Sequence, residues 1–375
     1  MAIDTGETQI RSKRPSDSAF KQQRLPAWQP ILTAGTVLPT FFVIGIAFIP
    51  VGIGLLYFSD EVKEVVVDYT NCNRTHIGTD GGYSITTLNT CSDAISKDKG
   101  SECICNISFT LETDFQGKVY LYYGLSNYYQ NHRRYVKSRD DKQLLGRTST
   151  TLSSDCLPFA SDIDSATGKE LPIAPCGAIA NSLFNDTLKI FRVSQNERVP
   201  VPLLRTGIAW DSDKKIKFQN PNAPKGLQDA FKDFTKPKYW QKHVWELDPD
   251  DQNNNGYQNE DLIVWMRTAA LPTFRKLYRR VDHNISGFMD GLMRGKYELL
   301  VNYTYDVSHF DGSKRMILST TSLIGGKNPF LGIAYIVVGC LCLLLGITLL
   351  FIHIKMGKST TEIINVTPRT PWTPQ

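Results

Sequence analysis

Two long uncharged segments constrain this chain more than any other feature of its sequence. No Asp, Glu, Lys or Arg occurs from Pro30 to Ser59 or from Asn328 to Ile352. A helix needs roughly 20 apolar residues to cross a bilayer, and both segments exceed that length. The sequence therefore predicts transmembrane helices at 30–59 and 328–353. The first is longer than a signal-peptide core of about 7 to 15 residues, so we interpret it as an uncleaved anchor.

The charges that flank the first segment predict its orientation. Five basic residues precede it: Arg11, Lys13, Arg14, Lys21 and Arg24. Mostly acidic residues follow it, and the positive-inside rule then places the N-terminal tail, 1–29, in the cytoplasm. A second span returns the C-terminal tail, 354–375, to the same side, as Lys355 and Lys358 also indicate. Residues 60–327 are then one extracytoplasmic domain.

Glycosylation motifs agree with that location. Six Asn-x-Ser/Thr sequons occur, and the first five lie in the outer domain, at Asn73, Asn106, Asn185, Asn284 and Asn302. The sixth, Asn365, lies in the predicted cytoplasmic tail. The crowding of sequons outside the membrane favours a glycoprotein of the secretory pathway. The charge balance, 42 basic against 37 acidic residues, gives no indication of nucleic-acid binding.

Alternating hydrophobicity predicts that the outer domain is built from strands. In "YELLVNYTYDV", 297–307, and "CICNISFTLE", 103–112, apolar and polar residues alternate, with a sequon on each polar, water-facing side. Further strands are expected at "KVYLYYG", "EVVVDYT", "GIAW" and "DLIVWM", with turns such as "FQNPNAPKG" between strands. The expected fold is two transmembrane helices plus a large, mostly antiparallel β domain with long loops.

Six cysteines in an oxidising compartment predict disulfides: Cys72, Cys91, Cys103, Cys105, Cys156 and Cys176. On a strand, Cys103 and Cys105 point the same way, about 6 to 7 Å apart, which suits two distant partners better than each other. The simplest closure pairs them with Cys72 and Cys91, and leaves Cys156 to Cys176. A zinc site would need four reduced ligands and is disfavoured. Cys340 and Cys342, in the second span, are interpreted as small packing residues rather than lipid-facing thiols.

Few motifs indicate chemistry. "DQNNNG", 251–256, opens like a calcium loop, but Leu262 stands where the closing glutamate belongs, so a turn is the preferred interpretation. The sequence shows no phosphate-binding loop and no hydrolase motif, and we expect no cofactor and no enzymatic activity. "YYQNHRRYVKSRDD", 128–141, is either a hydrated loop or a docking surface that uses Arg133 and Arg134.

Glycines recur every seven residues along the second span, at Gly332, Gly339 and Gly346, and Gly45 and Gly52 repeat this spacing in the first. Such a stripe lets a neighbouring helix approach closely. The three glycines of the second span are therefore candidates for contact with a partner subunit.

Five stretches give the chain a resemblance to a known family: "FKQQRLPAWQP", "YYGLSNYYQNHRRYVKSRDD", "PIAPCGAIANSLFNDT", "NEDLIVWMRTAALPTFRKLYR" and "GGKNPFLGIAYI". From about Phe20 to the end of the second span, the chain resembles the cell-division-cycle-fifty (ligand-effect-modulator) proteins. These are non-catalytic β-subunits of phospholipid-flipping P-type ATPases.

The resemblance implies a function and a disulfide pattern. It implies an obligatory partnership with a ten-span ATPase that moves aminophospholipids to the cytoplasmic leaflet, with a role in export of that ATPase from the endoplasmic reticulum. The expected location is the endoplasmic reticulum, Golgi, endosomes and plasma membrane. It also implies that Cys72 pairs with Cys105, Cys91 with Cys103, and Cys156 with Cys176.

Two other classes of protein share the predicted topology. A two-span channel subunit needs polar residues that line a pore, and the second span offers only Thr348 and two cysteines. A receptor or adhesion glycoprotein would instead bind a partner on another cell. An ectoenzyme is disfavoured because the sequence contains no catalytic motif.

Overall fold

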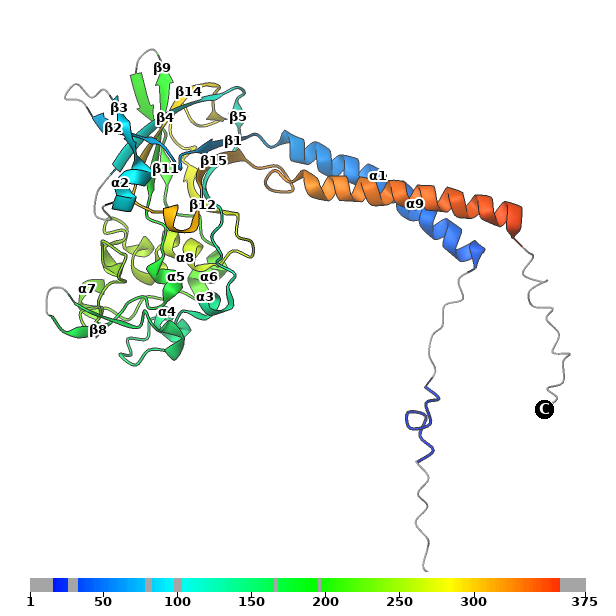
Figure 1. Ribbon diagram of the computed structural model, residues 1–375, viewed down its shortest axis with the longest axis horizontal. Helices are drawn as coiled ribbons and strands as arrows, with labels where there is room; N and C mark the ends of the chain where they lie inside the picture. The colour runs from blue at the N-terminus through cyan, green and yellow to red at the C-terminus, as the bar shows by residue number, and fades with distance from the viewer. Residues whose placement is uncertain are drawn as a thin grey trace, which may run out of the picture. The chain divides into compact units, whose positions relative to one another are not determined.

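The computed structural model describes residues 16–25, 33–77, 83–97, 103–164, 168–194 and 197–357 (Figure 1). Side chains are described at all of these positions except 76–77 and 83–89. The chain divides into two compact units. One contains residues 1–54 and 330–375, and the other contains residues 55–329.

The first unit is built on two long helices, α1 (Ala34–Glu61) and α9 (Pro329–Met356). Each has 28 residues and is apolar enough to cross a membrane. At a rise of 1.5 Å per residue, each helix is about 42 Å long, which exceeds the roughly 30 Å of bilayer hydrocarbon. The helices cover the described parts of both predicted spans, and α1 continues through Pro39 and Pro50.

The glycine stripes of the two helices face each other within this chain. A Cβ atom added to Gly52 would lie 2.9 Å from the carbonyl oxygen of Gly332, and one added to Gly45 would lie 3.0 Å from that of Gly339. Gly346 lies against the ring of Phe42. All three glycines of α9 are buried. Within this chain the stripe packs against α1, and contact of Gly332, Gly339 and Gly346 with a partner subunit stays a prediction.

The second unit is a mostly antiparallel β domain, as expected. One sheet has the order β1-β15-β6-β12-β11 and another the order β10-β9-β14-β4. The strands of the first sheet are β1 (Glu64–Asp68), β15 (Lys314–Thr320), β6 (Val119–Leu125), β12 (Phe274–Val281) and β11 (Leu203–Leu204). Those of the second are β10 (Glu197–Pro200), β9 (Thr187–Ser194), β14 (Gly295–Tyr303) and β4 (Cys103–Leu111). Every pair of neighbouring strands in both sheets is antiparallel.

Smaller elements complete the domain. Three two-stranded ribbons pair β13 (Gly291–Leu292) with β5 (Phe115–Gln116), β2 (Asn73–Ile77) with β3 (Tyr83–Thr90), and β7 (Ser161–Ile163) with β8 (Glu170–Pro172). The short α-helices are α2 (Cys91–Lys97), α3 (Arg133–Lys137), α4 (Asp141–Leu144), α5 (Ala178–Asn181), α6 (Asp211–Ile216), α7 (Leu227–Ala230) and α8 (Glu260–Met266). The 3₁₀ turns are η1 (Ser154–Cys156), η2 (Val244–Glu246), η3 (Gln252–Asn254), η4 (Gly256–Gln258) and η5 (Ser308–Phe310). Figure 1 shows α3 to α8 gathered below the strands of the two larger sheets, joined by long loops.

Strand β14 shows why the alternating pattern predicts its position. Tyr297, Leu299, Val301 and Tyr303 are fully buried, and the residues between them are half-buried. β14 lies between β9 and β4 and pairs with both. Because successive side chains of a strand point to opposite faces, one face of this central strand fills the core and the other remains polar.

Two predicted strands are wrong. "GIAW", 207–210, is a loop that leads into α6, and "DLIVWM", 261–266, lies in the helix α8. The Asn259 side chain caps this helix by accepting a hydrogen bond from the Leu262 amide at 3.1 Å. At the other end, the Lys276 ammonium donates to three main-chain carbonyls, those of Val264, Trp265 and Arg267. A short, continuous apolar run suits a buried strand or a buried helix equally, so only these caps distinguish them.

The "DQNNNG" segment folds into the two 3₁₀ turns η3 and η4, not into a hairpin turn. Asn253 is exposed, whereas Asn254 and Asn255 are buried and bind the surrounding backbone and side chains. Asn254 donates to Asp248 at 2.7 Å, and Asn255 donates to the Trp245 carbonyl at 2.6 Å. These side chains are engaged in holding loops together.

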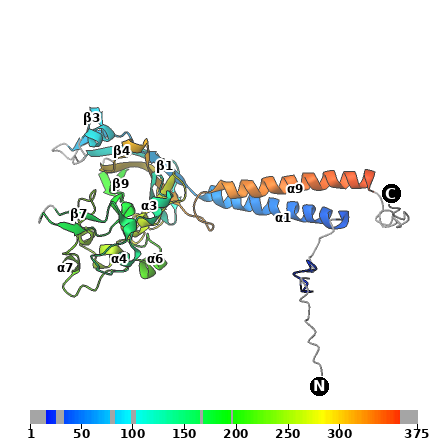
Figure 2. The same ribbon diagram turned by 60° about the horizontal axis from the view of Figure 1, so that its bottom comes forward.

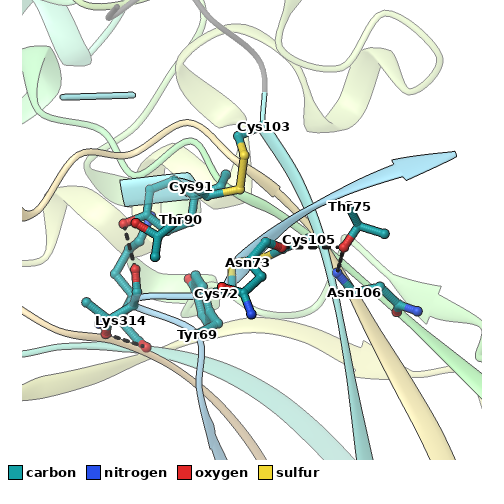
Figure 3. The surroundings of a disulfide bond; sticks show 12 residues. Tyr69, Cys72, Asn73, Thr75, Thr90, Cys91, Cys103, Cys105, Asn106 and Lys314 are labelled. Atoms are coloured by element: carbon teal, nitrogen blue, oxygen red, sulfur yellow. Dashed lines mark hydrogen bonds between the residues drawn. A yellow bond between two sulfur atoms is a disulfide. The ribbon is translucent and has the colours of Figure 1, made fainter. Parts of the chain in front are cut away.

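Three disulfides join Cys72 to Cys105, Cys91 to Cys103, and Cys156 to Cys176. These are the pairs that the family resemblance implies. Figure 3 shows the Cys91–Cys103 bond, with Cys72 and Cys105 nearby. The first two bonds tie the neighbourhood of β2 and α2 to the start of β4. The sulfur atoms of Cys72, Cys91 and Cys105 lie within 4.8 Å of one another, but a disulfide sulfur offers no thiolate to a metal.

The third disulfide supports a part of the domain that has little core of its own. Cys156 and Cys176 are buried with Ile173 in a small separate cluster, and among the described residues the partly buried hydrophobic side chains that pack against it are Leu152 and Ala160. The bond closes a loop across a sequence separation of 20 residues. In the chain-entropy model, such a loop stabilises the fold by roughly 3 kcal/mol.

We therefore expect a Cys156→Ser/Cys176→Ser variant to lose roughly 3 kcal/mol of unfolding free energy and to leave the endoplasmic reticulum slowly. Pulse-chase measurement of glycan maturation tests the second point. A Cys340→Ala/Cys342→Ala variant is the control, because these two cysteines form no disulfide. Export of the first variant at the control's rate would contradict the prediction.

Candidate partner interface

The 128–141 segment presents a basic surface around α3. His132, Arg133, Arg134 and Lys137 are exposed. None of these four side chains forms an ion pair with another described residue. Tyr129, just before them, is 59% exposed. Because an unpaired basic surface with an exposed aromatic ring is suited to contact with an acidic partner, the structure keeps Arg133 and Arg134 as interface candidates.

Side chains on the inner side of the same segment fix α3 to the domain. The Tyr135 hydroxyl lies 2.8 Å from the Ser182 hydroxyl, and the Tyr135 ring packs edge-on against Tyr128. Burial raises the pKa of Tyr135 well above its usual value. The Ser138 hydroxyl accepts a hydrogen bond from the Ala178 amide at 2.9 Å. The basic side chains are therefore carried on a rigid support.

The paired carboxylates of this segment have structural roles. Asp140 is buried and caps α4 by accepting hydrogen bonds from the amides of Lys142 and Gln143. Asp140 also accepts from the Ser153 amide at 2.8 Å. Asp141 is exposed and pairs with Arg139 at 2.9 Å. The two carboxylates are therefore not placed as a general acid and a general base that act together.

A cavity of about 390 Å³ lies between Tyr123, Asp186, Trp240, Asp261 and other residues of the domain. The Asp261 carboxylate, one of the groups that line the cavity, forms ion pairs with Arg205 and Arg279. Its oxygens are therefore engaged by these two guanidinium groups. The cavity therefore gives no support to the ectoenzyme alternative.

The five sequons of the outer domain differ in exposure. Asn73, Asn185 and Asn284 are exposed. Asn106 and Asn302 are half-buried, although strand periodicity predicts that both face water. Asn106 donates from its Nδ2 atom to Glu298 on the neighbouring strand at 3.1 Å, and Glu298 also pairs with Arg198. The polar face of this sheet is therefore partly covered by its own side chains.

The domain contains a fully buried ion pair that no sequence pattern predicts. Lys314 on β15 and Asp186 before β9 lie 2.7 Å apart, and neither side chain is exposed. Asp186 also accepts hydrogen bonds from the amides of Thr304 and Tyr305 and from the Tyr69 hydroxyl. Lys314 donates to the Tyr305 carbonyl at 2.6 Å. Burial lowers the pKa of Lys314 to about 8, while the Asp186 carboxylate opposes that shift.

No local pattern could have found this pair. Lys314 stands beside the exposed Arg315 at the start of a strand, and Asp186 lies within the sequon Asn185-Asp186-Thr187. Both positions look solvent-facing from the sequence. The ion pair and its hydrogen bonds connect the ends of β1 and β15 in one sheet to the ends of β9 and β14 in the other.

Comparison with known proteins identifies relatives over nearly the whole chain. The mouse protein "Cell cycle control protein 50A" is 53% identical over 355 residues, which cover 93% of this chain and 92% of the mouse protein. Human "Cell cycle control protein 50B" is 47% identical, with 91% and 94% covered. "ALA-interacting subunit 3" of Arabidopsis thaliana is 39% identical, with 94% and 89% covered.

The model of the LEM3 (ligand-effect modulator 3) / CDC50 family matches residues 55–359. That range contains the whole β domain and α9. The family match and the relatives agree over most of the sequence. The chain therefore belongs to the LEM3/CDC50 family.

Proposed function

We propose that this protein is the non-catalytic accessory subunit of a phospholipid-flipping P-type ATPase. It binds the ATPase within the same membrane and is needed for export of the ATPase from the endoplasmic reticulum and for movement of aminophospholipids to the cytoplasmic leaflet. The observation that carries the proposal is family membership over most of the chain. One plant relative is itself named as an interacting subunit.

The arrangement of the chain is suited to a subunit that binds another membrane protein. Two apolar helices flank a domain stapled by three disulfides, and the basic residues around α3 are exposed on a rigid support. We place both termini in the cytoplasm and the domain on the outer side. The protein then travels with its ATPase through the endoplasmic reticulum, Golgi, endosomes and plasma membrane.

Deleting the protein tests this function directly. We expect the ATPase to stay in the endoplasmic reticulum and phosphatidylserine to appear on the outer leaflet. The ATPase should also co-purify with the protein in detergent at a stoichiometric ratio. If lipid asymmetry and ATPase location are unchanged, with no related subunit to substitute, the receptor or adhesion alternative takes the place of this proposal.

The basic surface around α3 gives a sharper prediction. An Arg133→Glu/Arg134→Glu variant is expected to bind the ATPase at least about tenfold more weakly, because like charges placed across an interface repel. Binding in detergent at low and high salt measures the effect. Lys118→Glu/Lys225→Glu is the control, since both lysines are exposed elsewhere on the domain. Equal binding of the two variants would remove Arg133 and Arg134 from the interface.

The proposed topology predicts which sequons carry glycans. Up to five sequons of the outer domain are expected to be modified, and Asn365, which lies outside the described residues, is not. Glycosidase treatment should therefore shift the mobility of wild type and an Asn365→Gln variant equally. A smaller shift in the variant would place the C-terminal tail on the outer side and overturn the topology.

A further inference from the structure

A tight turn with an apolar tip lies between β15 and α9. Ser322 and Gly325 exchange two backbone hydrogen bonds, of 2.8 and 3.1 Å, around Leu323 and Ile324. The tips of such turns are usually Gly, Asn, Asp, Ser or Pro, because these residues suit the backbone and face water. Here Leu323 is 88% exposed and Ile324 is 53% exposed. Among the described residues between α1 and α9, Leu323 is the most exposed large apolar side chain.

The base of the turn is fixed to the strand that follows α1. The amide of Thr320 donates to the Lys63 carbonyl at 2.9 Å, and the Thr320 hydroxyl accepts from the Lys63 amide at 2.9 Å. On the other side of the tip, the Asn328 amide donates to the Ser59 hydroxyl near the end of α1 at 3.0 Å. The turn is therefore held from both ends and cannot fold its apolar tip into the domain core.

The turn lies close to the place where the chain enters the membrane. Asn328, which binds Ser59 near the end of α1, is four residues beyond Ile324, so the Cα atoms of Ile324 and Asn328 are at most about 14 Å apart. Tyr57, two residues before Ser59, is 69% exposed on α1. Exposed Tyr residues near the end of a membrane helix mark the level of the lipid headgroups. The apolar tip is thus within reach of that level.

We propose that Leu323 and Ile324 insert into the outer leaflet, at the boundary between headgroups and acyl chains. The lipid surface is the favoured occupant because α9, which is long and apolar enough to cross a membrane, begins five residues beyond Ile324. Two adjacent apolar side chains on a turn held at both ends are suited to shallow insertion. The insertion fixes the membrane-proximal side of the outer domain on the bilayer. This inference depends on α1 and α9 crossing the membrane, and not on any ATPase.

The position of the tip is measured with an environment-sensitive fluorophore on Leu323→Cys, in a Cys340→Ala/Cys342→Ala background, with the full chain in lipid nanodiscs. The matched control is Ile163→Cys, which is 70% exposed on β7. Figures 1 and 2 show the β7–β8 ribbon on the opposite side of the domain from β1. A quencher attached to the lipid should remove most of the fluorescence at position 323 and little at position 163.

The same measurement is repeated with the co-purified ATPase in the nanodisc. Quenching at position 323 under both conditions supports insertion into lipid. A probe at position 323 that is as accessible to water as the control overturns the proposal. Quenching that disappears when the ATPase is present also overturns it, because the tip would then contact the partner. Since the first measurement uses the chain alone, its outcome is independent of the proposed ATPase partnership.

Discussion

A Lys314→Met variant is expected to lose about 3–5 kcal/mol of unfolding free energy, because it leaves the Asp186 carboxylate buried without a countercharge. The methionine side chain fills most of the space of the lysine stem, so lost packing contributes little. The carboxylate keeps its two amide donors and the Tyr69 hydroxyl, but these do not neutralise it. Denaturant unfolding of the purified chain measures the loss.

The matched control is Arg315→Met on the same strand. Arg315 is 46% exposed and lies 3.5 Å from Asp68, so its loss should cost no more than about 1 kcal/mol. An Asp186→Asn/Lys314→Met double variant removes both charges and should recover part of the stability. Similar losses for Lys314→Met and Arg315→Met would show that the buried charge is not the cause.

The second large effect is expected at the contact between the two apolar helices. In a Gly52→Leu/Gly339→Leu variant, the new side chains meet the Gly332 carbonyl oxygen at 2.9 Å and the Gly45 carbonyl oxygen at 3.3 Å. Backbone atoms cannot rotate away, so the helices must separate. Overpacking one site costs about 1–3 kcal/mol, and two well-separated sites add, which gives about 2–6 kcal/mol.

The separation of α1 from α9 is measured by disulfide cross-linking of cysteines placed on the two helices. The rings of Phe48 and Tyr335 are 4.9 Å apart, so cysteines at these positions are expected to cross-link efficiently in a background without Cys340 and Cys342. The yield should fall sharply in the Gly52→Leu/Gly339→Leu variant. Gly54→Leu is the control, because no described residue outside its own stretch of α1 lies within 4 Å of its new Cβ atom. An unchanged yield in the double variant would mean that the helices do not use the glycines to approach each other.

What the sequence could predict depends on how local each signal is. The apolar spans and the alternation in β14 are visible within one window of residues, and the structure confirms the fold class. The run 261–266 is too short to show a helical period, and its caps come from Asn259 and from Lys276 on another strand. Its type therefore could not be predicted from the run alone.

Local sequence signals also do not identify which residues contact one another in the candidate site. The glycine spacing identified a surface for close helix packing, but spacing cannot say whether the neighbouring helix belongs to this chain or to a partner. The Lys314–Asp186 pair joins residues 128 positions apart, and neither position carries a local sign of burial. Family resemblance supplied the disulfide pairs, because spacing alone left the partners of Cys103 and Cys105 open.

The pairing of β1 with β15 has a consequence for how the protein is made. Glu64, just after α1, lies opposite Ser319, just before α9, and β15 separates β1 from β6. A strand synthesised almost last must therefore enter the sheet between two strands that have emerged earlier. Until then, β1 and β6 have unpaired edges, and unpaired edges promote aggregation. The sheet can therefore be completed only after nearly all of the chain up to α9 has been synthesised. A chain that is terminated before Lys314 should be retained in the cell and degraded.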